Sequence, residues 1–339
     1  MTKRIFISWC HFSRRIASMD NYFGFEIHLI PPLSERKWIK PFGYIFQALR
    51  TARVVMAGRP DEVWLQSPPT FLPHLLLALR AVAGRFRIVA DCHFQTFTPG
   101  WIWVPATIWA INHCDGVLVH NAESRPAAEA VGVNPKLIYT LEDPPSNIAP
   151  EQKRRTSPEA PPYVLAPCSF SSDEPVAVLL AAARLLPELC IMITGSRAKA
   201  ERLGFTRDCP ENVSFTDYLP LPEFERLLIG ASVVLGLTSV EGIQLSVANE
   251  ALGADKALVL SDTRILRAMF GEAALFGRNT PEDLAMRLRQ ALAARVELEG
   301  RSAALKARRQ QDWLATAAAV AAGLRRAHGP GISETGQAI

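Results

Sequence analysis

Short apolar runs alternate with segments of helical periodicity along almost the whole chain, and this alternation limits the possible folds more than any other feature. An apolar run followed by a helical segment is typical of a strand that is buried on both faces of a parallel sheet. The sequence therefore predicts an α/β protein with doubly wound, Rossmann-like sheets covered by helices. The expected strands lie at residues 4–9, 25–30, 61–69, 86–93, 116–122, 136–145, 163–170, 189–196, 232–239 and 257–262.

A polar, proline-rich stretch at residues 146–162 divides the alternation into two halves. This composition is typical of a surface linker, and 339 residues are enough for two domains with a core each. We therefore expect an N-terminal Rossmann-like domain at 1–145 on the acceptor side and a C-terminal one at 163–310. A helix at 311–328 is expected to pack back on the N-terminal domain, and residues 329–339 are expected to form a disordered tail.

The composition argues against several classes of protein. The formal net charge is only +4, whereas a nucleic-acid-binding protein usually concentrates Lys and Arg on one face, so we expect no nucleic-acid partner. The six cysteines are scattered without a Cys-x-x-Cys pair, which disfavours zinc and disulfides. The first residues lack the apolar run of a secretory signal, and no apolar stretch is long enough to span a bilayer. We expect a cytoplasmic protein that can rest against the inner face of the membrane.

The loops after the strands lack the motifs of several common ligand sites. A dinucleotide-binding sheet needs Gly-x-Gly-x-x-Gly after its first strand, but here Trp9 opens that loop and the next glycine is Gly24. The chain also lacks a Walker motif, a Gly-x-Ser-x-Gly elbow and a His-Glu-x-x-His zinc motif. A dinucleotide cofactor is therefore disfavoured, as is the chemistry that these motifs carry.

Two glutamates frame a glycine-bearing turn within residues 238–262. Glu241 and Gly242 lie in the expected loop, Glu250 lies on the next helix, and the apolar run "LVLSD" follows. With the two Rossmann-like halves, this pattern resembles the GT-B glycosyltransferases, which have two such domains facing each other across a cleft. More narrowly it resembles the retaining glycosyltransferase family four, whose hallmark is Glu-Gly-Phe-Gly and a second Glu on the next helix. Here eight residues separate the glutamates instead of the usual seven, with Asn249 at the expected place.

The resemblance and the chemistry of a diphosphate suggest how the C-terminal half binds a nucleotide sugar. The amino end of a helix offers unpaired N–H groups and a partial positive charge to phosphates. The residues entering that helix are Gly242, Ile243, Gln244, Leu245 and Ser246. We expect Glu250 to accept hydrogen bonds from the ribose hydroxyls and Glu241 to hold the donor sugar, as its counterpart does in the family. The structural alternatives are a helix-surface role for Glu250 and a helix-start role for Glu241.

One expected pair of cations is absent from its usual place. The family normally supplies an Arg and a Lys after the first strand of the second half, to neutralise the diphosphate. Here residues 168–175, "CSFSSDEP", contain no cation. A leaving diphosphate needs positive charge or donors, and the nearest substitutes are Arg197 and Lys199, which follow Gly195, or Arg264. The resemblance implies no obligatory metal, because helix dipoles and side chains replace it.

The loops of the N-terminal half supply candidates for the acceptor side. His93 closes an expected strand at the position where the family keeps a histidine near the donor sugar, and Asp91 is a candidate to fix its tautomer. The alternative is a partly buried histidine that only closes the strand. His11, Arg14 and Arg15 are candidates to bind an acceptor phosphate, the arginines through their planar forks. The alternative for these three is a solvated basic helix start.

Two segments raise the question of membrane contact. Trp101, Trp103 and Trp109 lie close together in the sequence and would suit a membrane interface, although such aromatics are more often part of a core. The C-terminal helix is basic, and either attracts anionic lipid or forms a solvated face. Its basic residues are Arg301, Lys306, Arg308 and Arg309.

Together these expectations describe a retaining, metal-independent glycosyltransferase with a UDP- or GDP-sugar as donor and no further cofactor. The expected acceptor is a glycan or a lipid-linked sugar, in the assembly of surface polysaccharide or a glycoconjugate. Two alternatives stay open. A nucleotide-sugar epimerase of the same fold would need a carboxylate acid/base pair facing the sugar ring. A degenerate GT-B protein that binds sugar without turnover would suit the missing Arg and Lys.

Overall fold

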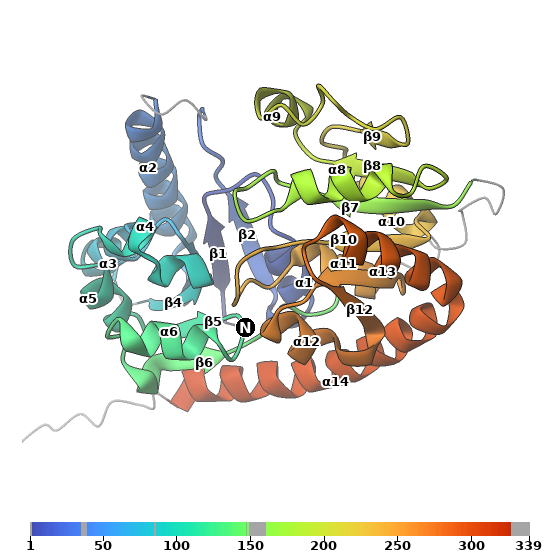
Figure 1. Ribbon diagram of the computed structural model, residues 1–339. Helices are drawn as coiled ribbons and strands as arrows, with labels where there is room; N and C mark the ends of the chain where they lie inside the picture. The colour runs from blue at the N-terminus through green and yellow to red at the C-terminus, as the bar shows by residue number, and fades with distance from the viewer. Residues whose placement is uncertain (1, 35–38, 85, 147, 149–160, 327–339) are drawn as a thin grey trace, which may run out of the picture. The chain divides into compact units, whose positions relative to one another are not determined.

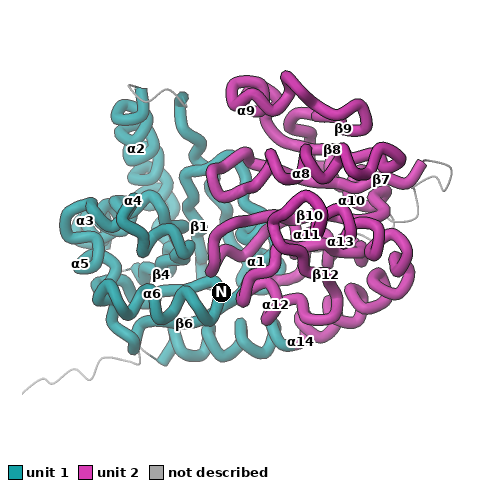
Figure 2. The backbone as a smooth tube through the Cα atoms, viewed as in Figure 1, with its two compact units in different colours: residues 1–143, 312–339 teal, residues 144–311 magenta. Residues whose placement is uncertain are grey.

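The chain forms two compact units, each built on its own sheet (Figure 2). The computed structural model describes residues 2–34, 39–84, 86–146, 148 and 161–326. Unit 1 comprises residues 1–143 and 312–339, and unit 2 comprises residues 144–311. Each sheet has six parallel strands with helices packed against it, which confirms the predicted α/β class (Figure 1). Most of the expected linker, and the expected tail at 329–339, lie outside the described residues.

The sheet of unit 1 has the strand order β2-β1-β3-β4-β5-β6, and every neighbouring pair is parallel. Its strands are β1 (Arg4–Ser8), β2 (Phe25–Leu29), β3 (Glu62–Ser67), β4 (Arg87–Cys92), β5 (Gly116–Val119) and β6 (Ile138–Thr140). The strand order reverses at β1, which pairs with β2 on one side and with β3 on the other. In open α/β sheets ligands bind at the carboxyl ends of the strands beside such a reversal.

Alternate residues of these strands point to opposite faces of the sheet and fill two cores. The helices of unit 1 are α1 (Arg14–Phe23), α2 (Lys40–Gly58), α3 (Leu72–Ala83), α4 (Pro99–Ile102), α5 (Thr107–Asn112) and α6 (Ser124–Ala130). Ile5 and Ile7 of β1 are buried in a core with residues of α2, α3, α5 and α6. Phe6, between them, is buried on the other face together with Trp64 and residues of α1.

The sheet of unit 2 has the order β12-β11-β10-β7-β8-β9 and reverses at β7, between β10 and β8. Its strands are β7 (Tyr163–Pro167), β8 (Cys190–Thr194), β9 (Val213–Phe215), β10 (Val233–Gly236), β11 (Ala257–Ser261) and β12 (Ala274–Gly277). Its helices are α8 (Val176–Arg184), α9 (Arg197–Arg202), α10 (Leu221–Gly230), α11 (Ser246–Gly253), α12 (Arg264–Phe270) and α13 (Pro281–Ala293). Two cores of buried apolar residues hold these layers together.

The last helix, α14 (Arg295–Arg326), contributes to the cores of both units. The sequence predicts an interruption near residues 297–302, and this is wrong: the helix runs through that stretch, and the chain breaks at Ala294 instead. Leu298 and Leu305 are buried in the cores of unit 2, at a spacing that places them on one face of the helix. Farther along, Trp313 begins a second buried stripe that belongs to unit 1.

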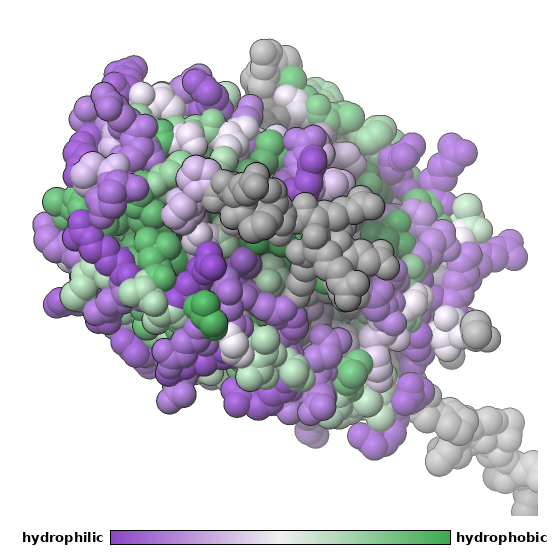
Figure 3. All heavy atoms as spheres, turned by 90° about the vertical axis from the view of Figure 1, so that its right-hand side faces the viewer, coloured by the Kyte–Doolittle hydropathy of each residue, from purple (hydrophilic) through white to green (hydrophobic). Residues whose placement is uncertain are grey.

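Apolar residues gather inside each unit and not in a membrane-spanning segment. Among the residues that the structure describes, no helix combines the length and the apolar character needed to cross a bilayer. The face shown in Figure 3 carries hydrophilic side chains over much of its area, with apolar side chains in smaller groups between them. A mixed surface of this kind is ordinary for a folded protein in water.

Candidate functional site

Unit 1 buries an ion pair at the carboxyl end of its sheet. Asp91, near the end of β4, has no exposed surface, and Arg15 on α1 is only 5% exposed. Arg15 Nε and Nη2 donate to the two carboxylate oxygens of Asp91 at 2.9 and 2.8 Å, while Nη1 donates to Asp143 at 2.6 Å. Burial alone would raise the pKa of Asp91, but the charge of Arg15 outweighs it and holds that pKa well below its usual range. Both groups therefore stay charged, in a bidentate geometry that fixes the guanidinium.

Two histidines and a glutamine extend this ion pair into a network. His120, which follows β5, donates from Nε2 to Asp91 at 3.1 Å, and its ring centroid lies 4.2 Å from that of His93. Gln66 of β3 donates its amide N–H to His93 Nε2, and its amide oxygen accepts from the Ser8 hydroxyl of β1. The network thus joins the carboxyl ends of four neighbouring strands, namely β1, at which the strand order reverses, and β3, β4 and β5 on one side of it.

These contacts settle the protonation state of His93. Because Gln66 donates to Nε2, the single proton of the neutral ring is on Nδ1. Burial, and next the neighbouring His120, lower the pKa of His93 to about 3. His93 is therefore neutral at pH 7 and presents one donor, Nδ1–H. The expectation that Asp91 fixes this tautomer is corrected here, because Asp91 binds Arg15 and His120, and Gln66 is the residue that holds His93.

The other three acceptor-side candidates do not share one environment. His11 is exposed in the loop after β1, and the guanidinium of Arg14 lies over the Phe12 ring at 5.5 Å. Arg15, by contrast, is buried with its fork filled by two carboxylates, so in this structure it holds Asp91 and Asp143 in place. Acceptor contact by His11 and Arg14 stays a prediction.

A hollow of about 190 Å³ opens in unit 1 beside the carboxyl ends of β1 and β3. Three large aromatic side chains line it, from the loop after β1, from α2 and from α4, and Lys40 supplies a cation. The aromatic residues are Trp9, Tyr44 and Trp101. Trp9 and Tyr44 stack with their ring centroids 6.1 Å apart. Flat aromatic faces beside a charged group suit a sugar or another ligand with both apolar and polar surfaces.

In unit 2, the two loops that flank the strand-order reversal are tied together. Asp173 lies in the β7–α8 loop, and its carboxylate accepts from the Thr238 hydroxyl of the β10–α11 loop at 3.1 Å. The carbonyl of Asp173 also accepts from the backbone N–H of Ser239 at 2.7 Å. Thr238 in turn is held by Ser261 at the end of β11, whose hydroxyl accepts its N–H at 2.9 Å. The loops therefore form one connected rim at the carboxyl edge of the sheet.

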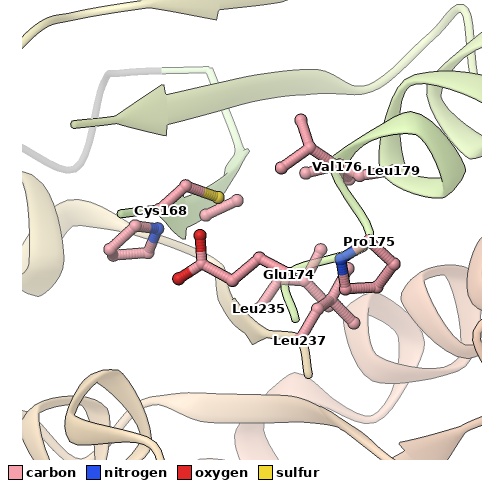
Figure 4. Close-up of a pocket in the computed structure, with 9 residues that line it drawn as sticks. Cys168, Glu174, Pro175, Val176, Leu179, Leu235 and Leu237 are labelled. Carbon is pink, nitrogen blue, oxygen red and sulfur yellow. The ribbon is translucent and has the colours of Figure 1, made fainter. Parts of the chain in front are cut away.

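A small pocket opens beneath this rim (Figure 4). Cys168, Glu174 and Leu237 are among its lining residues, and Figure 4 shows the Glu174 carboxylate directed towards Cys168. That carboxylate accepts from the backbone N–H of Ser169 at 3.1 Å and of Ser171 at 3.3 Å. Acidic side chains thus fold the β7–α8 loop on itself, and the lining of the pocket contains no cation.

A lysine from the neighbouring helix reaches the loop that lacks a cation of its own. Lys199 on α9 donates from Nζ to the carbonyl oxygen of Ser169 at 2.7 Å. The backbone at Gly195 also passes close to this loop: Gly195 has a φ of +137°, and a Cβ there would lie 1.9 Å from the Cys168 carbonyl oxygen. Arg197 is exposed and pairs with Glu201 on its own helix at 3.1 Å. The structure therefore brings Lys199, but not the Arg197 guanidinium, to the β7–α8 loop.

The glycine-bearing turn enters α11 in a conformation that few other residues tolerate. Gly242 is buried and has a φ of +77°, in the left-handed region that favours glycine. Glu241 is exposed, and its carboxylate accepts from the Arg264 N–H at 3.1 Å, at the first residue of α12. A carboxylate at that position also stabilises the positive end of the helix dipole. Glu241 thus makes the helix-start contact that was its structural alternative, although on α12 and not on its own helix.

One buried side-chain amide marks the amino end of α11. The helix begins at Ser246, and Leu245 precedes it without a side-chain cap. Both polar atoms of the Gln244 side chain are buried and have no hydrogen-bond partner among the described residues. Ser246 is exposed, and Ile243 and Leu245 are partly buried. Buried polar groups in native proteins are nearly always satisfied, so an orphaned amide here suggests a place that a ligand or water fills.

The second glutamate, Glu250, is half-buried one turn into α11. Its neighbour Asn249 is 3% exposed and accepts from Arg309 Nη1 at 2.9 Å. Sequence reasoning missed this contact, as it missed the Arg15–Asp91 network and the aromatic hollow. A signal for the network was present, because Asp91 interrupts an apolar strand and a buried carboxylate requires a partner. Among the described residues, no group of His, Cys, Asp and Glu side chains could hold a metal ion.

Comparisons with known proteins support the fold. No model of a known protein family matches the sequence, and neither does any curated protein. Solved structures do match: HepE of Anabaena has a TM-score of 0.68 at 12% identity, over 96% of this chain and 100% of that one. Sucrose-phosphate synthase of Thermosynechococcus elongatus has a TM-score of 0.69 at 14% identity, over 96% and 98%. The α,α-trehalose-phosphate synthase of Burkholderia xenovorans has a TM-score of 0.68 at 12% identity, over 95% and 100%. The GT-B fold implied by the sequence is thereby confirmed.

Proposed function

We propose that this protein is a glycosyltransferase that moves a sugar from a UDP- or GDP-sugar to a glycan or lipid-linked acceptor. Its fold neighbours support the donor class, since HepE was solved with UDP, with UDP-glucose, and with UDP and glucose. The observation that carries the proposal is the orphaned amide of Gln244 at the uncapped amino end of α11. Backbone N–H groups and a buried amide in this position suit a phosphate. The turn with Glu241 and Gly242, followed by Glu250 on the next helix, also favours retention at the sugar C1 and kinship with family four.

The proposed nucleotide site lies on unit 2. The diphosphate binds at residues 242–246, and Lys199 supplies the positive charge that the β7–α8 loop lacks. Glu250 accepts hydrogen bonds from the ribose hydroxyls. Glu241 touches the donor sugar, and its carboxylate also accepts from the backbone N–H of Arg264, which holds the turn. Side-chain and helix donors then stabilise the diphosphate as its bond to the sugar breaks, and we propose that no metal is required.

The acceptor side is assigned to unit 1. Neutral His93 offers a hydrogen-bond donor at Nδ1, which can orient a hydroxyl oxygen of the acceptor or of the sugar. With its Nε2 occupied by Gln66, His93 positions this hydroxyl and does not remove its proton. During transfer the acceptor oxygen bonds to the sugar C1, the bond from C1 to the diphosphate breaks, and the hydroxyl proton is released. We place this reaction in surface-polysaccharide or glycoconjugate assembly.

A second candidate is a degenerate protein that binds a nucleotide sugar without turnover. Asp173 and Glu174 favour it, because they place negative charge in the loop where the family has cations. The two candidates differ in one measurable respect. A transferase consumes donor and forms a new glycoside, whereas the degenerate protein binds the donor and leaves it intact.

The first experiment is a thermal-shift screen with UDP, GDP, ADP and TDP, followed by incubation of the stabilising donor sugar with candidate acceptors. A ligand that binds only the folded protein raises its melting temperature. Product analysis by proton NMR distinguishes retention from inversion, and chelation with EDTA tests independence of metal. Donor interconversion without an acceptor would identify an epimerase instead. Failure of all four nucleotides to bind would overturn the proposal.

Gln244→Leu tests directly whether the buried Gln244 amide contributes to nucleotide binding. The amide has no partner in the described structure, so its replacement by an apolar group of similar size should leave the free energy of unfolding unchanged or slightly higher. Nucleotide affinity should fall by about tenfold, equivalent to one hydrogen bond to a charged group. Gln290→Leu on the exposed face of α13 is the matched control and should bind as the wild type does.

A further inference from the structure

Helix α2 has its polarity inverted with respect to its own unit. The side that packs on unit 1 carries the small or polar residues Gly43, Gln47 and Thr51, with a single larger apolar residue, Val55. The exposed side carries large apolar residues: Phe42 is 66% exposed, Ile45 59%, Phe46 37%, Leu49 66% and Met56 52%. We call these five residues the α2 stripe. A helix in water normally shows the opposite arrangement.

The first four members of the α2 stripe form a continuous apolar patch, and Met56 extends the same face beyond the exposed Arg53. The other members of the stripe follow Phe42 at intervals of three, four, seven and fourteen residues, which places them within one face of a helix. That face is turned away from the buried one, since Gly43 and Gln47 lie on the other side of the same turns. Contiguous exposed apolar surface of this kind marks a site of interaction with a partner or a membrane.

The charge of the helix indicates which occupant fits the stripe. Residues 40–58 contain Lys40, Arg50 and Arg53 and no acidic residue. Within the part of the chain that the structure describes, no carboxylate pairs with these three cations. The guanidinium of Arg50 lies 5.8 Å from the centre of the Phe46 ring, at the margin of the stripe. Apolar side chains beside exposed arginines, here Arg50 and Arg53, suit the surface of an anionic membrane.

A second copy of this chain would be a poorer occupant. A symmetric pair brings the same surface of both copies together. The cations at the margin of one α2 stripe would then face those of the other without acidic residues on either helix. Anionic lipid head groups, by contrast, neutralise the cations while the acyl region takes up the apolar side chains.

We propose that α2 lies in the surface of an anionic membrane, with the α2 stripe inserted and Arg50 and Arg53 at the level of the head groups. Lys40, Gly43, Tyr44 and Gln47 of the same helix line the aromatic hollow of unit 1. The hollow is therefore held about one helix diameter, ~10 Å, from the lipid. If the proposed function holds, on which this last step rests, the acceptor is a sugar carried on a membrane lipid.

Vesicle flotation with the full chain tests the proposal. The probes are vesicles of phosphatidylcholine alone and of phosphatidylcholine mixed with phosphatidylglycerol. The wild type should float with the anionic vesicles, and Phe42→Gln with Leu49→Gln should weaken binding by more than about tenfold. Val82→Gln with Val296→Gln, at sites 79% and 76% exposed, is the matched control and should float as the wild type does. Arg50→Gln with Arg53→Gln should weaken binding by about thirtyfold and reduce its sensitivity to salt.

Three results would overturn the proposal. One is a wild type that stays unbound in the presence of anionic vesicles. Another is a stripe variant that floats as well as the control. The third is a wild-type dimer, seen by light scattering, that the stripe variant converts to a monomer, because the occupant is then a second copy. Circular dichroism checks that the stripe variant is folded. Its nucleotide binding in solution should be unchanged, so flotation without any nucleotide binding would refute the proposed function and leave the membrane surface supported.

Discussion

Lys199 Nζ lies 2.7 Å from the carbonyl oxygen of Ser169, so a lysine from α9 reaches the β7–α8 loop, which contains no cation of its own. An ammonium group has three donors, and this contact uses one of them. The remaining donors and the charge are available at the edge of the loop. Among the described residues, no carboxylate forms an ion pair with Lys199 that would cancel its charge.

Lys199→Met should therefore weaken binding of a nucleoside diphosphate by about tenfold and that of the matching monophosphate by less, because the distal phosphate loses a charged donor. Calorimetric titration with UDP and UMP, or with GDP and GMP, measures both affinities. Lys136→Met removes an exposed lysine of unit 1 and serves as the control. Equal losses for diphosphate and monophosphate would place Lys199 away from the distal phosphate.

The buried pair of Arg15 and Asp91 should dominate the stability of unit 1. Asp91→Ala leaves a buried guanidinium with only Asp143 to compensate it, and should lower the free energy of unfolding by about 3–5 kcal/mol. Urea denaturation followed by tryptophan fluorescence measures the change. Glu129→Ala breaks an exposed pair with Arg125 and should cost less than about 1 kcal/mol. Equal effects of the two substitutions would contradict a structural role for the buried pair.

His93 should make the protein sensitive to mild acid. Its pKa is about 3 in the folded protein against 6.5 for an ordinary histidine, so between these values the unfolded chain binds a proton that the folded protein excludes. Stability is therefore complete above pH 6.5 and falls as the pH drops towards 3, by at most about 1.4 kcal/mol per pH unit. The free energy of unfolding of wild type and His93→Asn is compared at several pH values. A difference between them that does not vary over this range would refute the assignment.

The sequence was sufficient to predict the fold because the buried strands are nearly continuous apolar runs. It missed the two edge strands of the unit 2 sheet, β9 with three residues and β12 with four, which are too short to stand out, and it missed α12 beside β12. The break expected within α14 does not occur, because Leu298 and Leu305 are buried at helical spacing on either side of Gly300. The local sequence pattern does not show which residues tertiary packing will bury.

The site was less predictable because its contacts join distant parts of the chain. Arg15 and Asp91 are 76 positions apart, and the sequence around either residue does not indicate that the other is its partner. For α2, periodicity identifies an apolar face but does not say whether that face is buried. The ordinary expectation is burial, whereas here Gly43 and Gln47 face the interior and Phe42 faces outward.

The proposed role of Glu250 can be separated from a purely structural one by pairing a substitution with a change in the ligand. Glu250 is half-buried on α11, so a loss of affinity on Glu250→Gln alone would not show which group it contacts. If its carboxylate accepts from the ribose hydroxyls, the wild type should bind a ribonucleotide about tenfold more tightly than its 2′,3′-dideoxy analogue, and Glu250→Gln should lose most of that preference. A structural role would weaken both ligands equally and preserve the preference. Affinities of the four combinations, with thermal unfolding as a check on folding, decide between the two.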